Sequence, residues 1–239
     1  MKSNDSSTRE TGNRALPKPD CVVKVGEGRG FVFEYRVRNP PSMLRRLRKL
    51  QTRKFRPHKF IWPRVVVTAA HCLGNLPPAH GMAFFWERTY NLLGTLDGSK
   101  KDICAECLFV DPVADIAVLG CPDEQAMGQQ ADAYHEVVDE ASAVRIGKPR
   151  NGRAWVLTLD GHWTSTPMKV LSGLYGTSLS IGPTSPGMSG SPILNDAGRA
   201  VGLVALGGET INSKGERQQI EMQGPQPILS RDLPARFIG

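Results

Sequence analysis

The chain has 239 residues, of which 40% are hydrophobic, and it carries a formal net charge of +7. Its 25 glycines and 18 prolines favour many short strands joined by turns, so we expect an all-β protein with one sizeable core or two small ones. No apolar run approaches the ~18 residues that span a bilayer, so the sequence predicts no transmembrane segment.

The N-terminal residues 1–20 are polar and have no apolar core of the kind found in secretory signals. We therefore expect a disordered leader over residues 1–20. Residues 29–33 follow and contain the consecutive apolar residues Phe31, Val32 and Phe33.

A basic segment, residues 34–60, lies between residues 29–33 and the apolar run at residues 65–67, and is called the basic insertion. From residue 36 to residue 64 the sequence has eleven arginines and lysines and no acidic residue. Met43, Leu47 and Leu50 would lie on one face of a short helix. Such a helix fits an acidic protein partner, an anionic membrane or a nucleic-acid backbone. Alternatively, its apolar stripe packs on the protein itself, or the segment attracts the acidic residues between 111 and 140.

Two apolar runs present residues that pair in acid–base chemistry. The β-branched run at residues 65–67 predicts a buried strand, and His71 comes just past its end, anchored but reachable. Asp115 opens the apolar run at residues 116–119, so its carboxylate would lie at a strand end, partly shielded from water. Such shielding favours a firm hydrogen bond to an imidazole.

The chain has five cysteines, an odd number: Cys21, Cys72, Cys104, Cys107 and Cys121. Cys104 and Cys107 have the spacing of a zinc-ligand pair, but neither a second pair nor a suitably placed histidine pair accompanies them. We expect neither a metal site nor a cofactor.

Ser189 lies in a segment, residues 186–192, with the sequence Pro-Gly-Met-Ser-Gly-Ser-Pro. Gly187 and Gly190 permit a tight turn whose backbone N–H groups converge, as an oxyanion hole requires. The amides of Gly187 and Ser189 are the candidates. A serine hydroxyl becomes a good nucleophile when a histidine takes its proton and a carboxylate orients that histidine. The chain supplies His71, Asp115 and Ser189 in that order.

These segments resemble those of chymotrypsin-like (trypsin-fold) serine peptidases, in which Thr-Ala-Ala-His-Cys (residues 68–72) and Gly-x-Ser-Gly-Ser-Pro (residues 187–192) carry the histidine and the serine. The resemblance implies two six-stranded β-barrels with the active site in the cleft between them. We expect the N-terminal barrel at residues 21–121, a connector at 122–140 and the C-terminal barrel at 141–239.

The chain departs from the family pattern at two positions that bear on its environment and activation. In secreted relatives the cysteine after the histidine forms a disulfide, but the preceding strand here has no partner for Cys72. We expect Cys72 to be a free, buried thiol and the protein to be cytoplasmic. In many relatives, activation by N-terminal cleavage depends on an ion pair with an acidic residue immediately before the serine. This chain has Met188 at that position, so we do not expect activation by such cleavage.

The resemblance assigns substrate binding to Pro183, Thr184, Val204, Ala205, Leu206 and Gly207. Pro183 stands where tryptic enzymes have an aspartate, which disfavours basic residues before the cut. Thr184 resembles glutamate-selective enzymes, but Val204 replaces the histidine that those enzymes carry. A small or medium apolar residue before the cut is the leading expectation, and glutamate is the alternative.

The sequence thus predicts a serine endopeptidase that acts by acyl transfer on protein or peptide substrates. The alternative is a catalytically silent peptidase fold whose basic insertion binds an acidic protein, a membrane or nucleic acid.

Overall fold

The computed structural model describes residues 16–35, 64–78, 85–171, 176–179, 184–205, 209–211, 217–219, 226–227 and 229. Residues 1–15 of the expected leader and all but the first two residues of the basic insertion lie outside these ranges. Residues 16–20 are described, and the Pro17 carbonyl accepts a hydrogen bond of 2.9 Å from the indole of Trp163. The end of the leader is therefore held against the body of the protein.

The first half of the chain forms the closed six-stranded barrel that was expected. Its strand order is β1-β2-β3-β6-β5-β4, and every neighbouring pair is antiparallel. The strands are β1 (Val22–Val25), β2 (Gly28–Glu34), β3 (Arg64–Thr68), β4 (Thr89–Gly94), β5 (Ile103–Asp111) and β6 (Ile116–Gly120).

The barrel core explains why the apolar runs form its central strands. All five residues of β6 are buried, and so are four of the five residues of β3. Phe31, Val66 and Val118 are completely buried and belong to the same core. The β-branched side chains fill this core, so the strand ends that carry His71 and Asp115 rest on a rigid body.

The second half of the chain forms a curled sheet with six strands in the order β11-β10-β7-β8-β9-β14. The expected second closed barrel is thus only half closed within the described residues. The Leu229 amide, just after β14, donates to the Val201 carbonyl in β11 at 3.1 Å, which brings the two edges of the sheet together. The strands are β7 (Gly152–Leu157), β8 (Trp163–Leu171), β9 (Gly176–Leu179), β10 (Pro192–Asn195), β11 (Ala200–Leu203) and β14 (Gln226–Pro227).

The smaller elements lie around these two bodies. The short strands β12 (Glu209–Ile211) and β13 (Arg217–Gln219) pair with each other, and α2 (Phe85–Arg88) precedes β4. Two single 3-10 turns, η1 (Pro19–Cys21) and η2 (Ala70–Leu73), precede β1 and follow β3. None of the helices in the described ranges is long and apolar enough to cross a membrane.

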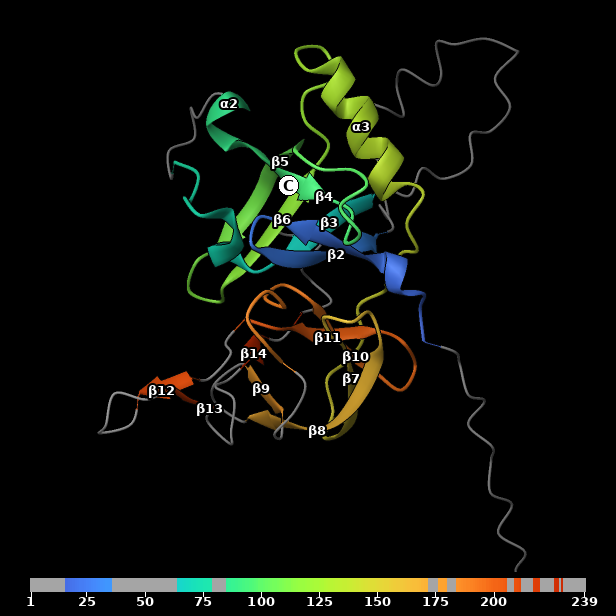
Figure 1. Ribbon diagram of the computed structural model, residues 1–239, viewed down its shortest axis with the longest axis vertical. Coiled ribbons are helices and arrows are strands. Elements are labelled where there is room, and N and C mark those ends of the chain that lie inside the picture. Colours follow the sequence, from blue (N-terminus) through green and yellow to red (C-terminus); the bar gives the residue numbers. More distant parts are fainter. Residues whose placement is uncertain are drawn as a thin grey trace, which may run out of the picture.

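The connector contains an eleven-residue helix, α3 (Gly128–Val138), which the sequence prediction did not include. It lies on the first barrel (Figure 1) and buries Ala131, Tyr134, Val137 and Val138. The Tyr134 hydroxyl donates to the Leu119 carbonyl at 3.3 Å. The helix therefore covers the end of the barrel where β6 leads into the connector.

The two bodies meet along a seam formed by β2 and the second sheet (Figure 1). The Val144 amide donates to the Val32 carbonyl at 2.8 Å. Across the same seam the buried guanidinium of Arg29 donates to the carbonyls of Leu157 and Thr158, at 3.0 and 3.1 Å. These polar bonds accompany apolar contacts, because buried residues of both halves, such as Phe31 and Leu203, belong to one core cluster.

Candidate active site

His71 lies in η2, directly after the buried strand β3. The Ala70 amide donates to the Asp115 carbonyl at 3.2 Å, and the His71 amide donates to Asp115 Oδ1 at 2.9 Å. These backbone bonds fix η2 against the turn that precedes β6. The histidine therefore has little freedom to move away from Asp115.

The Asp115 carboxylate holds the His71 ring through its second oxygen. The distance from His71 Nδ1 to Asp115 Oδ2 is 2.7 Å. A carboxylate at Nδ1 favours the tautomer in which Nδ1 carries the proton and donates it to the hydrogen bond. The lone pair of Nε2 is then free to accept a proton.

Asp115 adopts a backbone conformation that few residues tolerate. Its φ is +53°, in the left-handed region where aspartate and asparagine are among the less disfavoured side chains. Asp111 stabilises the turn before it, because one Asp111 carboxylate oxygen accepts hydrogen bonds from the amides of Val113 and Ala114. The turn aims both Asp115 oxygens at His71.

Ser189 lies in a tight turn flanked by two glycines with positive φ, Gly187 at +91° and Gly190 at +84°. Within this turn the amides of Met188, Gly190 and Ser191 donate to backbone carbonyls. The amides of Gly187 and Ser189 have no acceptor among the described residues. These two N–H groups are thus available for an external oxygen, which is the requirement for an oxyanion hole.

The backbone of Ser189 is bound to the first barrel. Its carbonyl accepts the Arg29 amide at 2.7 Å and the Cys72 thiol at 3.6 Å. A Cβ atom on Gly28 would lie 2.5 Å from Cys72 Sγ and 2.7 Å from the Ser189 carbonyl oxygen, so glycine is required for this approach. Ser189 therefore lies beside the residue that follows His71.

The predicted triad requires two side-chain contacts, one between His71 and Asp115 and one between His71 and Ser189. His71 and Asp115 are directly bonded. Among the hydrogen bonds of the described residues, none joins the His71 ring to the Ser189 hydroxyl, although the thiol of the next residue, Cys72, donates to the Ser189 carbonyl. Catalytic hydrogen bonds are often long without substrate and shorten when it binds.

Cys72 is a buried free thiol. Burial raises its pKa, and the nearby Asp115 charge acts in the same direction. The thiol therefore stays protonated near neutral pH, where it can donate to the Ser189 carbonyl. Ser189 is consequently the better candidate for the nucleophile.

Met188 is completely buried in the core of the second sheet. The Ser185 amide donates to its sulfur at 3.3 Å. The position immediately before Ser189 is thus occupied by a buried apolar side chain. The serine turn is therefore formed without an ion pair at this position.

The residues expected to bind substrate are only partly described. Pro183, Leu206 and Gly207 lie outside the described residues. Thr184 and Ala205 are buried, and Val204 packs in the same core as Met188. Buried hydroxyls at Thr184 and Ser191 have no hydrogen-bond partner among the described residues.

Two residues that position Ser189 were not predicted from the sequence, namely Gly28 and Arg29. The only signal is an arginine between two glycines at the start of an apolar strand. The pattern shows that Arg29 is a charged residue next to an apolar run. It does not identify the carbonyls that the Arg29 side chain binds.

The model of the trypsin-like peptidase domain family matches residues 58–203. The human pathogenic astrovirus serine protease has a similar structure, with a TM-score of 0.51, 16% identity, and coverage of 92% of this chain and 95% of the other. An inactive form of Rv3671c from M. tuberculosis H37Rv gives a TM-score of 0.45 and 16% identity, over 92% of this chain and 86% of the other. Comparison with curated proteins returned no match.

Proposed function

Because the chain belongs to the trypsin-like peptidase domain family, we propose that it is a serine endopeptidase that cleaves protein or peptide substrates by acyl transfer. The observation that supports this most directly is the bond of 2.7 Å between His71 Nδ1 and Asp115 Oδ2, next to a serine turn with two available amides. Family membership supports the reaction class, and the geometry supports the assignment of residues.

In the proposed reaction, Ser189 Oγ attacks the scissile carbonyl while His71 Nε2 takes the hydroxyl proton. The tetrahedral intermediate places its negative oxygen at the amides of Gly187 and Ser189. His71 then gives the proton to the leaving amine, the C–N bond breaks and an acyl ester remains on Ser189. Water, activated in turn by His71, hydrolyses this ester. Asp115 stays ionised and stabilises the imidazolium.

The proposed site needs no activation by cleavage of the N-terminus. Such activation depends on a charge next to the serine, whereas Met188 is apolar and already packed in the core. The turn geometry and the His71–Asp115 bond are both present with Met188 packed in the core.

We propose a small or medium apolar residue before the scissile bond. Pro183 carries no charge to bind lysine or arginine, and Val204 carries none to bind a carboxylate. The buried hydroxyl of Thr184 keeps glutamate as the alternative, because a hydroxyl can donate to a carboxylate.

The test is covalent labelling of the full chain with a fluorophosphonate, which reacts with activated serines. We expect labelling of the wild type and none of Ser189→Ala, because the nucleophile is removed. Ser191→Ala is the matched control, since its buried hydroxyl has no partner among the described residues, and it should keep full labelling.

Screening a peptide library with the wild type then reports the residue before the cut. An unlabelled wild type that cleaves no peptide would contradict the proposal and would favour a catalytically silent binding module.

A further inference from the structure

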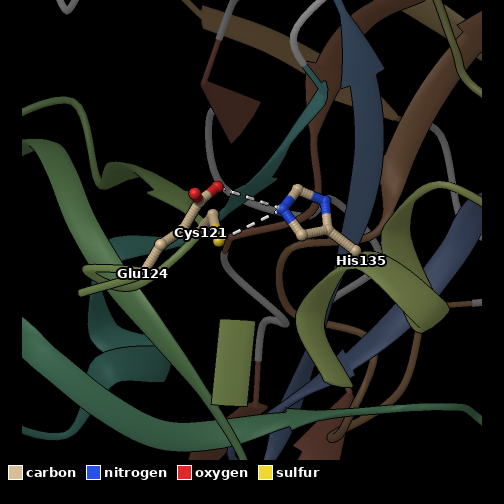
Figure 2. Close-up of side chains that lie close together, drawn as sticks. All are labelled: Cys121, Glu124 and His135. Atoms are coloured by element: carbon tan, nitrogen blue, oxygen red, sulfur yellow. Dashed lines mark hydrogen bonds and ion pairs between the residues drawn. The ribbon is translucent and has the colours of Figure 1, made fainter. Parts of the chain in front are cut away.

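Three potential metal ligands converge where the first barrel meets the connector (Figure 2). Cys121 follows the end of β6, Glu124 lies in the next turn, and His135 is on α3. Cys121 Sγ is 3.5 Å from His135 Nε2, and Glu124 Oε1 is 3.7 Å from the same nitrogen. All three ligand atoms lie within 4.8 Å of one another.

These separations match those around a tetrahedral zinc ion. With Zn–S of about 2.3 Å and Zn–N or Zn–O of about 2.0–2.1 Å, the sulfur and nitrogen are about 3.6 Å apart and the nitrogen and oxygen about 3.3 Å apart. The thiol and the imidazole already have this spacing. The Glu124 side chain is 75% exposed, so it can make the small adjustment that remains.

The His135 ring is held in the orientation that metal binding requires. Its Nδ1 lies 3.0 Å from Oδ2 of Asp139, the C-cap residue of α3. A proton on Nδ1 donates to this carboxylate, which leaves the lone pair of Nε2 directed at Cys121 and Glu124. A carboxylate on the outer nitrogen is the usual support for a zinc-bound histidine.

The electrostatic environment at Cys121 favours a cation. The carboxylates of Glu124, Asp139, Asp132 and Glu106 all act electrostatically on Cys121. No lysine or arginine occurs between residues 111 and 140. A bound dication would neutralise part of this negative charge and would itself deprotonate the thiol, releasing one proton.

We propose that Cys121, Glu124 and His135 bind one Zn²⁺ ion, with water as the fourth ligand and Asp139 orienting His135. Thiolate, imidazole and carboxylate are each ligands that zinc accepts. This site differs from the one considered from the sequence. Cys104 and Cys107 lie three residues apart in strand β5, so their side chains point to opposite faces of the strand.

The role of this ion would be structural. Cys121 and Asp115 lie at opposite ends of β6, about 20 Å apart at the usual rise of a strand. Zinc would fasten α3 to the end of β6 without touching the proposed catalytic residues. Its binding is therefore measurable independently of any peptidase activity.

The test uses the full chain, stripped of metal with a chelator and then titrated with Zn²⁺ alone against a chromophoric competitor. We expect one zinc ion per chain and a higher melting temperature with zinc. Co²⁺ in place of zinc should give a sulfur-to-cobalt charge-transfer band. Cys121→Ser and His135→Gln should each weaken zinc binding by at least ~100-fold, and Asp139→Asn by ~10–100-fold.

The matched controls are Cys104→Ser and His162→Gln, which remove the same atom types outside the cluster and should bind zinc like the wild type. If Cys121→Ser does not fold, Glu124→Gln decides, because its exposed side chain is not needed for packing; it should weaken binding by ~10-fold or more. Absence of the cobalt band, or zinc binding unchanged in Cys121→Ser or Glu124→Gln, would overturn the proposal.

Discussion

Gly190 is the residue that permits the closest approach between the serine turn and the first barrel. A Cβ atom at this position would lie 1.8 Å from the Arg29 carbonyl oxygen and 2.6 Å from Thr68 Oγ1. Its amide also donates to the Val204 carbonyl. Glycine is therefore needed both for the positive φ and for the contact itself.

Gly190→Ala should displace the serine turn from β2. Left-handed backbone alone costs about 1–2 kcal/mol for alanine, and the contact with Arg29 adds to this. We expect a lower free energy of unfolding in urea and a fluorophosphonate labelling rate reduced by at least ~10-fold, since a displacement of about 1 Å costs roughly 100-fold in catalysis.

Gly161→Ala is the control for this substitution. Gly161 has nearly the same φ, +82°, but a Cβ atom added there would have no neighbour within 4 Å among the described residues. It should lose stability from the backbone alone and keep the wild-type labelling rate. Equal labelling rates in both variants would show that the close contact at Gly190 does not hold the nucleophile.

Single residues with characteristic chemistry were the easiest to predict. His71 and Asp115 each flank an apolar run, and the structure bonds them to each other as expected. The supporting residues were not predictable, because their role depends on distant backbone atoms. Arg29 binds carbonyls more than 120 residues away in the sequence.

Among the secondary-structure elements, α3 depends on an arginine from a different element. Arg64, the first residue of β3, donates through Nη1 to the carbonyls of Val138, Asp139 and Ala141 at the end of the helix. The last carbonyls of a helix have no partner within it, and a cation placed there also interacts favourably with the helix dipole.

Arg64→Ala should therefore destabilise the docking of α3 by about 1–3 kcal/mol, the usual range for hydrogen bonds to a charged group. Urea denaturation measures the loss. Lys100→Ala is the matched control, because Lys100 forms exposed ion pairs with Glu136 on the same helix and with Glu140 just beyond its end. Such exposed pairs contribute about 0–1 kcal/mol. An Arg64 variant as stable as the Lys100 variant would contradict this account.

The elements differ in how well the sequence predicts them. Strands β2, β3 and β6 each contain a run of three or more consecutive apolar residues, and such runs indicate buried strands. Helix α3 was missed, although Ala131, Tyr134 and Val138 have helical spacing. Its apolar face is narrow and its composition is polar, so from the sequence the segment resembles a linker. The structure shows that Tyr134 packs against the barrel and bonds the Leu119 carbonyl.

At the scale of the whole molecule, the two halves meet through a shared apolar cluster and through polar contacts, among them the hydrogen bonds of the Arg29 guanidinium. The side chain is 6% exposed and bonds the carbonyls of Leu157 and Thr158, while the Arg29 amide binds the Ser189 carbonyl. Closure of the second sheet could not be predicted from the sequence either, because it depends on contacts between its edge strands rather than on a local pattern.

Arg29→Met keeps the length of the side chain but removes its donors. It should lower the free energy of unfolding by about 1–3 kcal/mol, because carbonyls at the seam lose their partner. It should also reduce fluorophosphonate labelling by ~10-fold or more, because the seam that positions Ser189 opens. Faster hydrogen exchange in the turn between β7 and β8 would separate this local opening from global loss of stability.

Arg29→Lys should recover only part of both losses, because an ammonium group lacks the planar fork that reaches neighbouring carbonyls together. Arg153→Met serves as the control for removing an arginine, since Arg153 forms an exposed ion pair with Asp196 on the second sheet. It should change stability by at most about 1 kcal/mol and leave labelling intact. Wild-type labelling in Arg29→Met would mean that the backbone bond from Arg29 to Ser189 suffices to hold the two halves in register.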